Sequence, residues 1–379
     1  MKLADEVSEK ILDILEMSGL DESTQSSYRQ RLQAIRKDMR RLATDFAAYK
    51  FSEAHYTDAY FLYNFPTNLA KIAVVIEKIR LHYPDLLCGR TRMSILDIGC
   101  GNGAGICGAY YALRDFPEIQ QFNFVGIDSS DPMLGQARVV ARWLRRRDPR
   151  VRVHFSKSKI EDSYPLAIKR KYDLIMCINS LAEIIEEEDI QIRFIGSTFR
   201  HLRDGGLFIM IEPALKKFSR RLMRLRNRLV SNKRIQLLLP CLHDSPCALL
   251  EVDNRKEWCH QSLSWSPPDF LRIINQGINR EIDVLKFSYL VIARSTERLK
   301  RPCGHLVISH LLKEKGKQRF YICTPEGRVE LVRLDRSKSA INAGYDKISK
   351  GVIVNLTDIV HKKDDYWQVT KGSTAKVVK

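Results

Sequence analysis

A cluster of glycines directly after a short apolar segment constrains the fold of this chain more than any other feature. The apolar segment covers residues 94–98 and carries Asp97, and Gly99, Gly101 and Gly103 follow at every second position. Glycines between a strand and a helix let the backbone bend sharply and approach a ligand closely, beside the free amides of the helix N-terminus. The motif therefore predicts a strand, a ligand-binding turn and a helix, in that order.

Further strand and helix patterns extend this motif into an α/β domain. Strand-like segments are expected at residues 122–128, 150–156, 172–178 and 207–211. A helix is expected at 131–147, between the first two of them. Strands that alternate with helices imply parallel βαβ units and a doubly wound sheet.

The two ends of the chain differ from this central pattern. Helices are expected at 27–50 and at 67–82, the second opened by Pro66. A late strand is expected at 287–293, and further strands are expected at 305–312, 319–323, 328–334 and 351–356. The residues after the last of these strands are expected to form a loose tail. We therefore expect a helical N-terminal region (1–88), a central domain (89–300) and a small β-rich C-terminal region (301–379).

Two carboxylates favour one kind of ligand for the glycine turn. In dinucleotide-binding folds the glycines hold a pyrophosphate, which Asp97 would repel. S-adenosylmethionine carries an ammonium group, so an acid is useful at that point. Asp128 ends the next strand, where a carboxylate can bind ribose hydroxyls.

Two later segments resemble class I methyltransferases. Residues 171–183 resemble their fourth motif, and residues 202–207 resemble their late Leu-x-x-Gly-Gly turn. The resemblance implies a class I S-adenosylmethionine-dependent methyltransferase (Rossmann-like) sheet. The residues expected at the cofactor are Asp97, Gly99, Gly101, Gly103, Asp128 and Asn179.

Catalytic residues are much harder to find than cofactor residues. Many amino-methylating enzymes carry an Asp/Asn-Pro-Pro-aromatic sequence where this chain has Asn179, Ser180, Leu181 and Ala182. Cys177 lies within an apolar strand, where a core role is the simpler interpretation. The sequence assigns no catalytic residue, and whether the chain is an enzyme stays open.

The charge of the chain indicates a polyanionic partner. Lys and Arg total 63 against 45 acidic residues, a net charge of +18. A basic helix is expected at 214–235, which holds nine cations and no acid, and a second basic patch at 142–150. The candidate RNA-binding residues are Lys216, Lys217, Arg220, Arg221, Arg224 and Arg228. Like charges repel along a helix, so an RNA partner is a simpler explanation than a solvated surface.

A membrane partner is not expected, because no apolar run approaches the roughly 18 residues of a spanning helix. The first ten residues resemble neither a secretory signal nor a transit peptide. A cytoplasmic location is the expectation, or the mitochondrial matrix if the protein is eukaryotic.

Nine cysteines in such a compartment are expected to be reduced thiols, buried side chains or metal ligands. Cys241, Cys247 and Cys259 lie in a cysteine-rich insertion at 240–268. Their spacing is not Cys-x-x-Cys, so ordinary thiols and a metal site both stay open. His243 and His260 are alternative zinc ligands.

Four segments together resemble the methyltransferase-like proteins of the small ribosomal subunit, a family of mitochondrial assembly factors and their bacterial relatives. They are residues 240–247, 258–260, 287–290 and 321–327, and the similarity runs with gaps from about 60 to 355. The resemblance implies a four-iron cluster (4Fe–4S) held by Cys241, Cys247, Cys259 and Cys323, with zinc as the alternative. Leu242 replaces a usual proline, and Asn102 replaces the proline of a Gly-Pro-Gly turn, but neither departure removes a ligand.

These observations together predict a ribosomal small-subunit assembly protein. It would bind small-subunit rRNA and S-adenosylmethionine, carry a structural iron–sulfur cluster, and be a monomer away from the assembling subunit. One alternative is an active rRNA methyltransferase. Another is a non-catalytic RNA-binding scaffold with a zinc site.

Overall fold

A computed structural model describes residues 5–14, 35, 37–38, 40–41, 57–159, 170–185, 187–250, 257–277, 283–294 and 297–378. The helix expected at 27–50 lies outside these residues, apart from 35, 37, 38, 40 and 41. The chain divides into two compact units that interleave along the sequence. The first contains residues 1–78, 88–180 and 263–285, and the second contains 79–87, 181–262 and 286–379.

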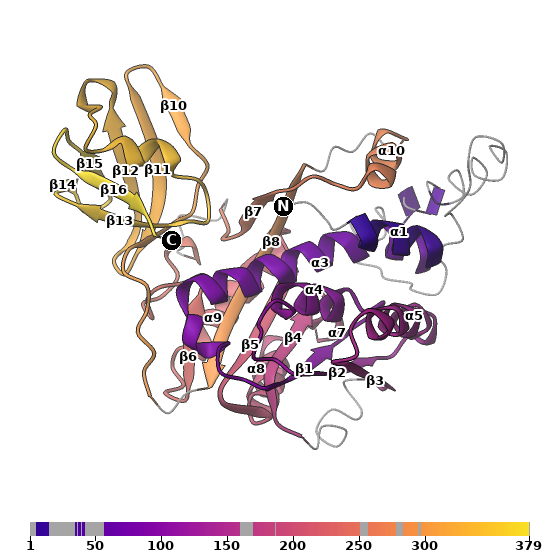
Figure 1. Cartoon of the computed structure of the whole chain (residues 1–379). Helices are drawn as coiled ribbons and strands as arrows, with labels where there is room; N and C mark the ends of the chain where they lie inside the picture. The colour runs from indigo at the N-terminus through magenta and orange to yellow at the C-terminus, as the bar shows by residue number, and fades with distance from the viewer. Residues whose placement is uncertain are drawn as a thin grey trace. The chain divides into compact units, whose positions relative to one another are not determined.

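The first unit contains four parallel strands in the order β3-β2-β1-β4 (Figure 1). They are β1 (Arg92–Ile98), β2 (Gln121–Asp128), β3 (Val151–Lys157) and β4 (Tyr172–Ile178). All seven residues of β4 are buried, as expected for a strand whose two faces are covered. Each strand lies within two residues of its expected start.

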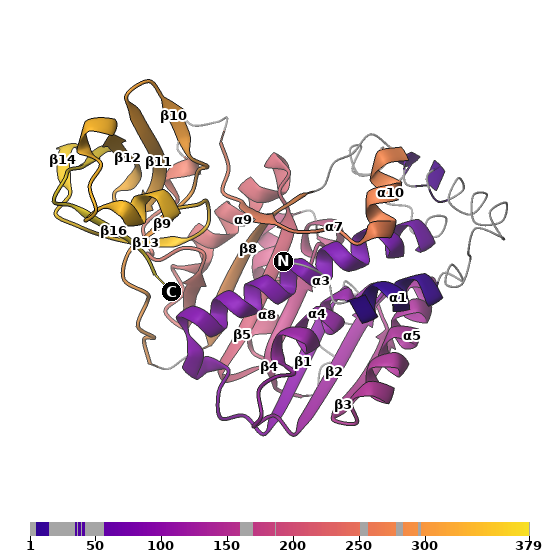
Figure 2. The ribbon, with the colours of Figure 1, turned by 45° about the horizontal axis from the view of Figure 1, so that its top comes forward.

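Helices follow the first two strands of this unit. The turn after β1 leads into α4 (Ala104–Leu113), and the turn after β2 leads into α5 (Asp131–Arg147), which has its expected bounds (Figure 2). Ser130 caps α5 by accepting a hydrogen bond from the Met133 backbone N–H at 3.4 Å. The buried residues of α5 recur at helical spacing, so its opposite face is left to solvent.

The helix expected to begin after Pro66 begins much earlier. α3 (Thr57–His82) runs through Pro66, so the prediction that this proline opens the helix is wrong. Phe61, Leu62 and Phe65 precede the proline and are almost fully buried, and this packing outweighs the hydrogen bond that proline removes. The hydroxyl of Thr67 donates to the backbone C=O of Asn64 at 3.0 Å, which satisfies one carbonyl beside the proline. The unit also contains α1 (Asp5–Ile14) and α10 (Asp269–Gly277).

The second unit contains three neighbouring strands in the order β5-β8-β6, with β8 antiparallel to both neighbours. They are β5 (Leu202–Pro213), β8 (Val284–Arg294) and β6 (Ile235–Leu239), and a short β7 (Gln261–Ser264) also pairs with β8. The helices of this unit are α7 (Leu181–Ile184), α8 (Glu188–Phe199) and α9 (Lys216–Leu229). The basic helix expected at 214–235 is therefore shorter, and its last residue begins β6.

The parallel order β3-β2-β1-β4 and the antiparallel late strand β8 are features of the class I S-adenosylmethionine-dependent methyltransferase fold. The predicted fold class is confirmed. The short 3₁₀ helices of the chain are η3 (Pro84–Leu86), η4 (Ala248–Leu250), η5 (Asp335–Ser337) and η6 (Ala343–Lys347).

The C-terminal part of the second unit is a second sheet with its own core (Figures 1 and 2). Its strands are β9 (His305–Val307), β10 (Leu312–Glu314), β11 (Lys317–Thr324), β12 (Gly327–Leu334), β13 (Ile353–Thr357), β14 (Val360–Lys363), β15 (Tyr366–Val369) and β16 (Thr374–Val377). Phe320, Leu331 and Tyr345 are buried in that core. The prediction of a loose tail is wrong, because β15 pairs with β12 and β16 pairs with β13.

Candidate cofactor and metal sites

The glycine motif forms a tight turn at the carboxyl end of β1. Gly99, Gly101 and Gly103 all have positive φ angles, of 69°, 49° and 85°, which explains why glycine is needed at each position. The backbone N–H groups of Gly99 and Cys100 both donate to the C=O of Ile127, at 2.8 and 3.0 Å. These bonds fix the turn against the end of β2.

Asp97 is a buried acid of this site whose carboxylate lacks hydrogen-bond partners in the described part of the chain. Its side chain is 1% exposed, and neither carboxylate oxygen has a hydrogen-bond partner among the described residues. Burial, and then the charge of Asp128, raise the pKa of Asp97 to about 7, while the nearby backbone N–H of Ile106 lowers it slightly. A buried carboxylate without a partner is costly, so this position suits a cationic ligand group.

Asp128 lies at the end of β2 and holds the turn in place. One of its oxygens accepts a hydrogen bond from the Gly101 backbone N–H at 2.7 Å, and the other accepts from the Ser130 N–H at 2.9 Å. Burial raises the pKa of Asp128, although these hydrogen bonds act in the opposite direction. Each oxygen keeps a second lone pair, with which it can accept a bond from a ligand hydroxyl.

Asn179 follows β4 with a positive φ of 54°, which is uncommon for a residue other than glycine. Its amide nitrogen donates to the side-chain oxygen of Asn68 at 2.8 Å, and its own oxygen is buried without a partner among the described residues. Ser180, the next residue, donates to the C=O of Ile98 at 2.9 Å. The expected cofactor residues therefore gather at the carboxyl ends of β1, β2 and β4.

Two residues of this site were not predicted from the sequence. Asn68 lies on α3 and positions Asn179, and no motif marks it. Gly105 lies in the first turn of α4, where a Cβ atom would come within 2.4 Å of an Asp97 carboxylate oxygen. The signal that could have identified Gly105 is a glycine in the first turn of a helix that follows a strand ending in an acid. Only glycine lets the helix backbone approach the Asp97 carboxylate this closely.

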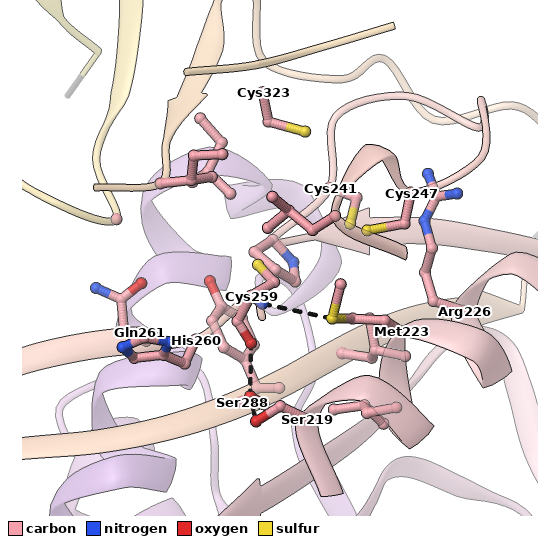
Figure 3. Close-up of a pocket in the computed structure, with 18 of the residues that line it drawn as sticks. Ser219, Met223, Arg226, Cys241, Cys247, Cys259, His260, Gln261, Ser288 and Cys323 are labelled. Atoms are coloured by element: carbon pink, nitrogen blue, oxygen red, sulfur yellow. Dashed lines mark hydrogen bonds between the residues drawn. The ribbon is translucent and has the colours of Figure 1, made fainter. Parts of the chain in front are cut away.

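The second candidate site is a pocket in the second unit that contains four cysteines (Figure 3). Cys241 follows β6, Cys247 precedes η4, Cys259 precedes β7 and Cys323 lies on β11. Its other lining residues are mostly apolar, and include two arginines, Arg226 and Arg328, but no Asp or Glu among the described residues. The structure thus brings together all four cysteines predicted as metal ligands.

The backbone around these cysteines is anchored by specific hydrogen bonds. The Cys247 N–H donates to the side chain of Asn227 at 3.0 Å, and the Cys259 N–H donates to the sulfur of Met223 at 3.4 Å. The hydroxyl of Ser288 donates to the Cys259 C=O at 2.7 Å (Figure 3). Residues of α9 and β8 therefore position the thiols.

Three of the four thiols are poor acids in this pocket. Burial raises the pKa of Cys247 to about 11, and it also raises the pKa values of Cys259 and Cys323. The charge of neighbouring cysteines is the next cause in each case, so the four side chains interact with one another. A bound metal would have to displace these protons, as thiolate ligation requires.

The two histidines considered as zinc ligands lie beside the cysteines. The Nε2 atom of His243 is 3.3 Å from the Cys323 sulfur. The His260 ring contacts the Trp258 C=O at 3.1 Å and the Lys350 ammonium at 2.8 Å, so both of its nitrogens are engaged. Within the described ranges, no group of three or more His, Cys, Asp and Glu side chains is placed to hold a single metal ion.

The basic helix α9 is not the free cationic surface that its sequence suggests. Arg221 is buried, and Arg220 donates to the backbone C=O groups of Leu249 and Glu257. Exposed Arg224 and Arg228 pair with acids of α8, namely Glu188 and Asp189. Lys216 and Lys217 are exposed at the start of the helix. The repulsion between like charges that suggested a polyanion is thus partly relieved by α8.

The exposed face of α5 differs from that of α9 because most of its arginines lack acidic partners among the described residues. Four of its five exposed arginines have no ion pair or hydrogen-bond partner in the part of the chain that the structure describes: Arg138, Arg142, Arg145 and Arg146. Arg147 and Arg150 of the same expected patch are engaged, by Glu6 and Asp148 respectively. Four cations without an acidic partner among the described residues therefore lie together on α5.

No helix among the described residues is long and apolar enough to cross a membrane.

Comparisons with solved structures find methyltransferases at low similarity. The plantazolicin methyltransferase BpumL, solved with S-adenosylhomocysteine, is 14% identical and matches over 70% of this chain and 98% of its own, with a TM-score of 0.39. The magnesium protoporphyrin IX methyltransferase of Synechocystis is 12% identical over 68% of this chain and 97% of its own, with a TM-score of 0.35.

Comparisons with curated proteins find two kinds of relative. The ubiquinone biosynthesis O-methyltransferase of Rickettsia typhi is 29% identical over 38% of this chain and 48% of its own length. The mitochondrial Rsm22-cox11 tandem protein 2 of Schizosaccharomyces pombe is 24% identical over 63% of this chain and 32% of its own length. The chain thus spans half or less of the length of these relatives. A family profile described as mitochondrial small ribosomal subunit Rsm22 matches residues 54–346, most of the chain, and the chain belongs to this family.

Proposed function

We propose that this protein assists assembly of the small ribosomal subunit, binds rRNA and S-adenosylmethionine, and carries a structural 4Fe–4S cluster. The observation that carries the proposal is the convergence of Cys241, Cys247, Cys259 and Cys323, from four separate segments, on one pocket. Membership of the Rsm22 family supports the ribosomal part. The fungal relatives are named as mitochondrial, which supports the mitochondrial matrix as the location, while a cytoplasmic location stays a prediction from the sequence.

The donor set supports a cluster over zinc. All four candidate ligands are thiols, and thiolates are the ligands of iron–sulfur clusters, although four cysteines also hold zinc in many structural sites. The cluster would cross-link the loops before η4 and β7 to the C-terminal sheet. Anaerobic purification should give brown protein that absorbs near about 400 nm and contains iron and sulfide. Colourless protein with one zinc per chain would refute the iron assignment.

The first unit supports the cofactor part of the proposal. Asp97 would face the ammonium group of S-adenosylmethionine, Asp128 would accept bonds from its ribose hydroxyls, and the glycine turn would let the backbone approach it. Calorimetry with S-adenosylmethionine tests this directly. An absence of binding at millimolar ligand would exclude any role for the cofactor and leave a scaffold protein.

The unpaired arginines of α5 support rRNA binding, together with Lys216 and Lys217 of α9. RNA affinity that depends on phosphate neutralisation falls as salt rises, and its salt dependence weakens when contacting cations are removed. The triple variant Arg142→Glu, Arg145→Glu and Arg146→Glu should bind small-subunit rRNA at least about tenfold more weakly in 0.1 M salt. Arg224→Glu with Arg228→Glu is the comparison, because these two arginines already have acidic partners. Equal losses for both variants would show that α5 has no special role.

An active rRNA methyltransferase is the second candidate, favoured by the intact glycine turn and the unpaired Asp97. Methyl transfer from labelled S-adenosylmethionine to purified small subunits would establish it, with Asp97→Asn as the control. Cofactor binding without transfer would favour an assembly role.

A further inference from the structure

Arg226 is a buried cationic side chain without an acidic partner among the described residues. It lies on α9, is 1% exposed and lines the cysteine pocket (Figure 3). Its guanidinium donates to the backbone C=O groups of His243 and Ser245, the second at 2.5 Å, and to the side chain of Asn227 at 3.0 Å. These carbonyls lie in the loop that joins Cys241 to Cys247, so Arg226 holds that loop in place.

No carboxylate neutralises this buried cation among the described residues. One candidate is Asp244, which lies between the two residues whose carbonyls Arg226 binds. Asp244 pairs instead with Arg298 at 3.0 Å and with Arg301 at 2.5 Å. The Nε atom of Arg226 is buried without a hydrogen-bond partner. A buried charge is costly unless an opposite charge compensates it.

Another arginine of the same unit shows the usual solution. Arg333 is also 1% exposed, but it pairs with the carboxylate of Asp346 and donates to Gln318 at 3.0 Å. Arg333 thus has an anionic partner, whereas Arg226 has none among the described residues. Arg226 lines the same pocket as the four cysteines, and no Asp or Glu is among the described residues that line it.

We propose that Arg226 is the built-in counterion of the metal-loaded cysteine site. The inference rests on the proposed metal site and adds a residue to it. Four thiolates bound to iron or zinc carry a net negative charge, which a buried guanidinium stabilises strongly in an apolar pocket. With protonated thiols, the same guanidinium is an uncompensated charge. Arg226 therefore destabilises the metal-free chain and stabilises the loaded one, and it acts as a positioning residue for the loop between Cys241 and Cys247.

The test compares charge and hydrogen bonding at this position in the full-length chain. Arg226→Gln removes the charge and keeps a donor, Arg226→Lys keeps the charge, and Arg333→Gln is the matched control at a paired arginine. Anaerobically purified proteins are challenged with an iron chelator, and bleaching near about 400 nm is followed. We expect Arg226→Gln to lose its cluster at least about tenfold faster than wild type, with Arg226→Lys closer to wild type.

Two further readouts separate this role from a purely structural one. Thermal unfolding should show that Arg226→Gln lowers the stability of the loaded protein but leaves that of the metal-free protein unchanged or raises it, whereas Arg333→Gln lowers both equally. In a titration with dithionite, Arg226→Gln should lower the midpoint potential, because reduction adds a negative charge that the guanidinium no longer stabilises. Equal bleaching rates for wild type and Arg226→Gln, or equally fast bleaching of the Gln and Lys variants, would overturn the counterion role. A wild-type chain that binds neither iron nor zinc would refute the metal site itself.

Discussion

Asp97 in the first unit and Arg226 in the second form an instructive pair, because both are buried to 1% exposure and neither has a partner of opposite charge among the described residues. They differ in sign. The acid lies where the ammonium of a cofactor would bind, and the cation lies where metal-bound thiolates would be. Because an unpaired buried charge lowers the stability of a fold, each of the two positions would gain stability from a bound group of opposite charge.

The largest effect is expected from removal of one thiol of the second site. Cys259→Ser should reduce bound iron and sulfide several-fold and lower the melting temperature of the loaded protein, because the free energy of metal binding also stabilises the fold. Iron and sulfide analysis after anaerobic purification measures the change. Cys303→Ser is the matched control, because Cys303 is exposed and lies outside the pocket. If both variants keep their metal, the second site does not bind it through Cys259.

Neutralising the acid of the first site should weaken cofactor binding. We expect Asp97→Asn to lower the affinity for S-adenosylmethionine about 10- to 100-fold, or about 1.4 to 2.7 kcal/mol, because a buried charge–charge contact is lost. Calorimetry at pH 8 measures the change. Asp115→Asn, at a side chain that is 81% exposed, should leave the affinity unchanged. An unchanged affinity for Asp97→Asn would contradict the proposal that the Asp97 carboxylate binds the cationic group of the cofactor.

The close approach of α4 to Asp97 gives a prediction on stability. Gly105→Ala should destabilise the protein by about 1 to 3 kcal/mol, because the added methyl group would overlap the carboxylate. Gly135→Ala, in α5 with nothing within 4 Å of an added Cβ, should instead stabilise it by about 0.5 to 1 kcal/mol. Denaturant unfolding of the ligand-free protein measures both. Equal signs for the two variants would contradict the tight packing of Gly105.

The smallest expected effect is a dependence on pH. The folded pKa of Asp97, about 7, lies above its ordinary value of 3.8, so the folded state favours the protonated form. This contribution to stability is complete below pH 3.8 and is lost as pH rises through 7. Between pH 6 and 8 the ligand-free wild type should lose about 1 kcal/mol relative to Asp97→Asn. Affinity for the cationic cofactor should rise over the same interval. A difference between the two proteins that does not change with pH would contradict the raised pKa.

The core of the first site could be predicted from the strand pattern, although Asn68 and Gly105 were missed, whereas the four cysteines of the second site were grouped only by a family resemblance. Asp97, Asp128 and the glycines lie at the ends of successive strands, so the strand pattern alone places them together. Arg226 could not be singled out, because its neighbours on α9 are also basic and its burial depends on a loop that follows β6. Likewise, the sequence of α9 alone predicts a free cationic helix. It does not show that acids of α8 pair with Arg224 and Arg228.

The four cysteines of the pocket are synthesised at different stages of translation, because they are spread over residues 241–323 of the sequence. Cys241, Cys247 and Cys259 precede the C-terminal sheet, whereas Cys323 lies on β11 within it. During translation, three thiols are therefore complete before the strand that carries the fourth has been made. A nascent or truncated chain that stops before β11 offers an open set of three thiols. A metal held by all four thiols would therefore require that synthesis has passed this strand.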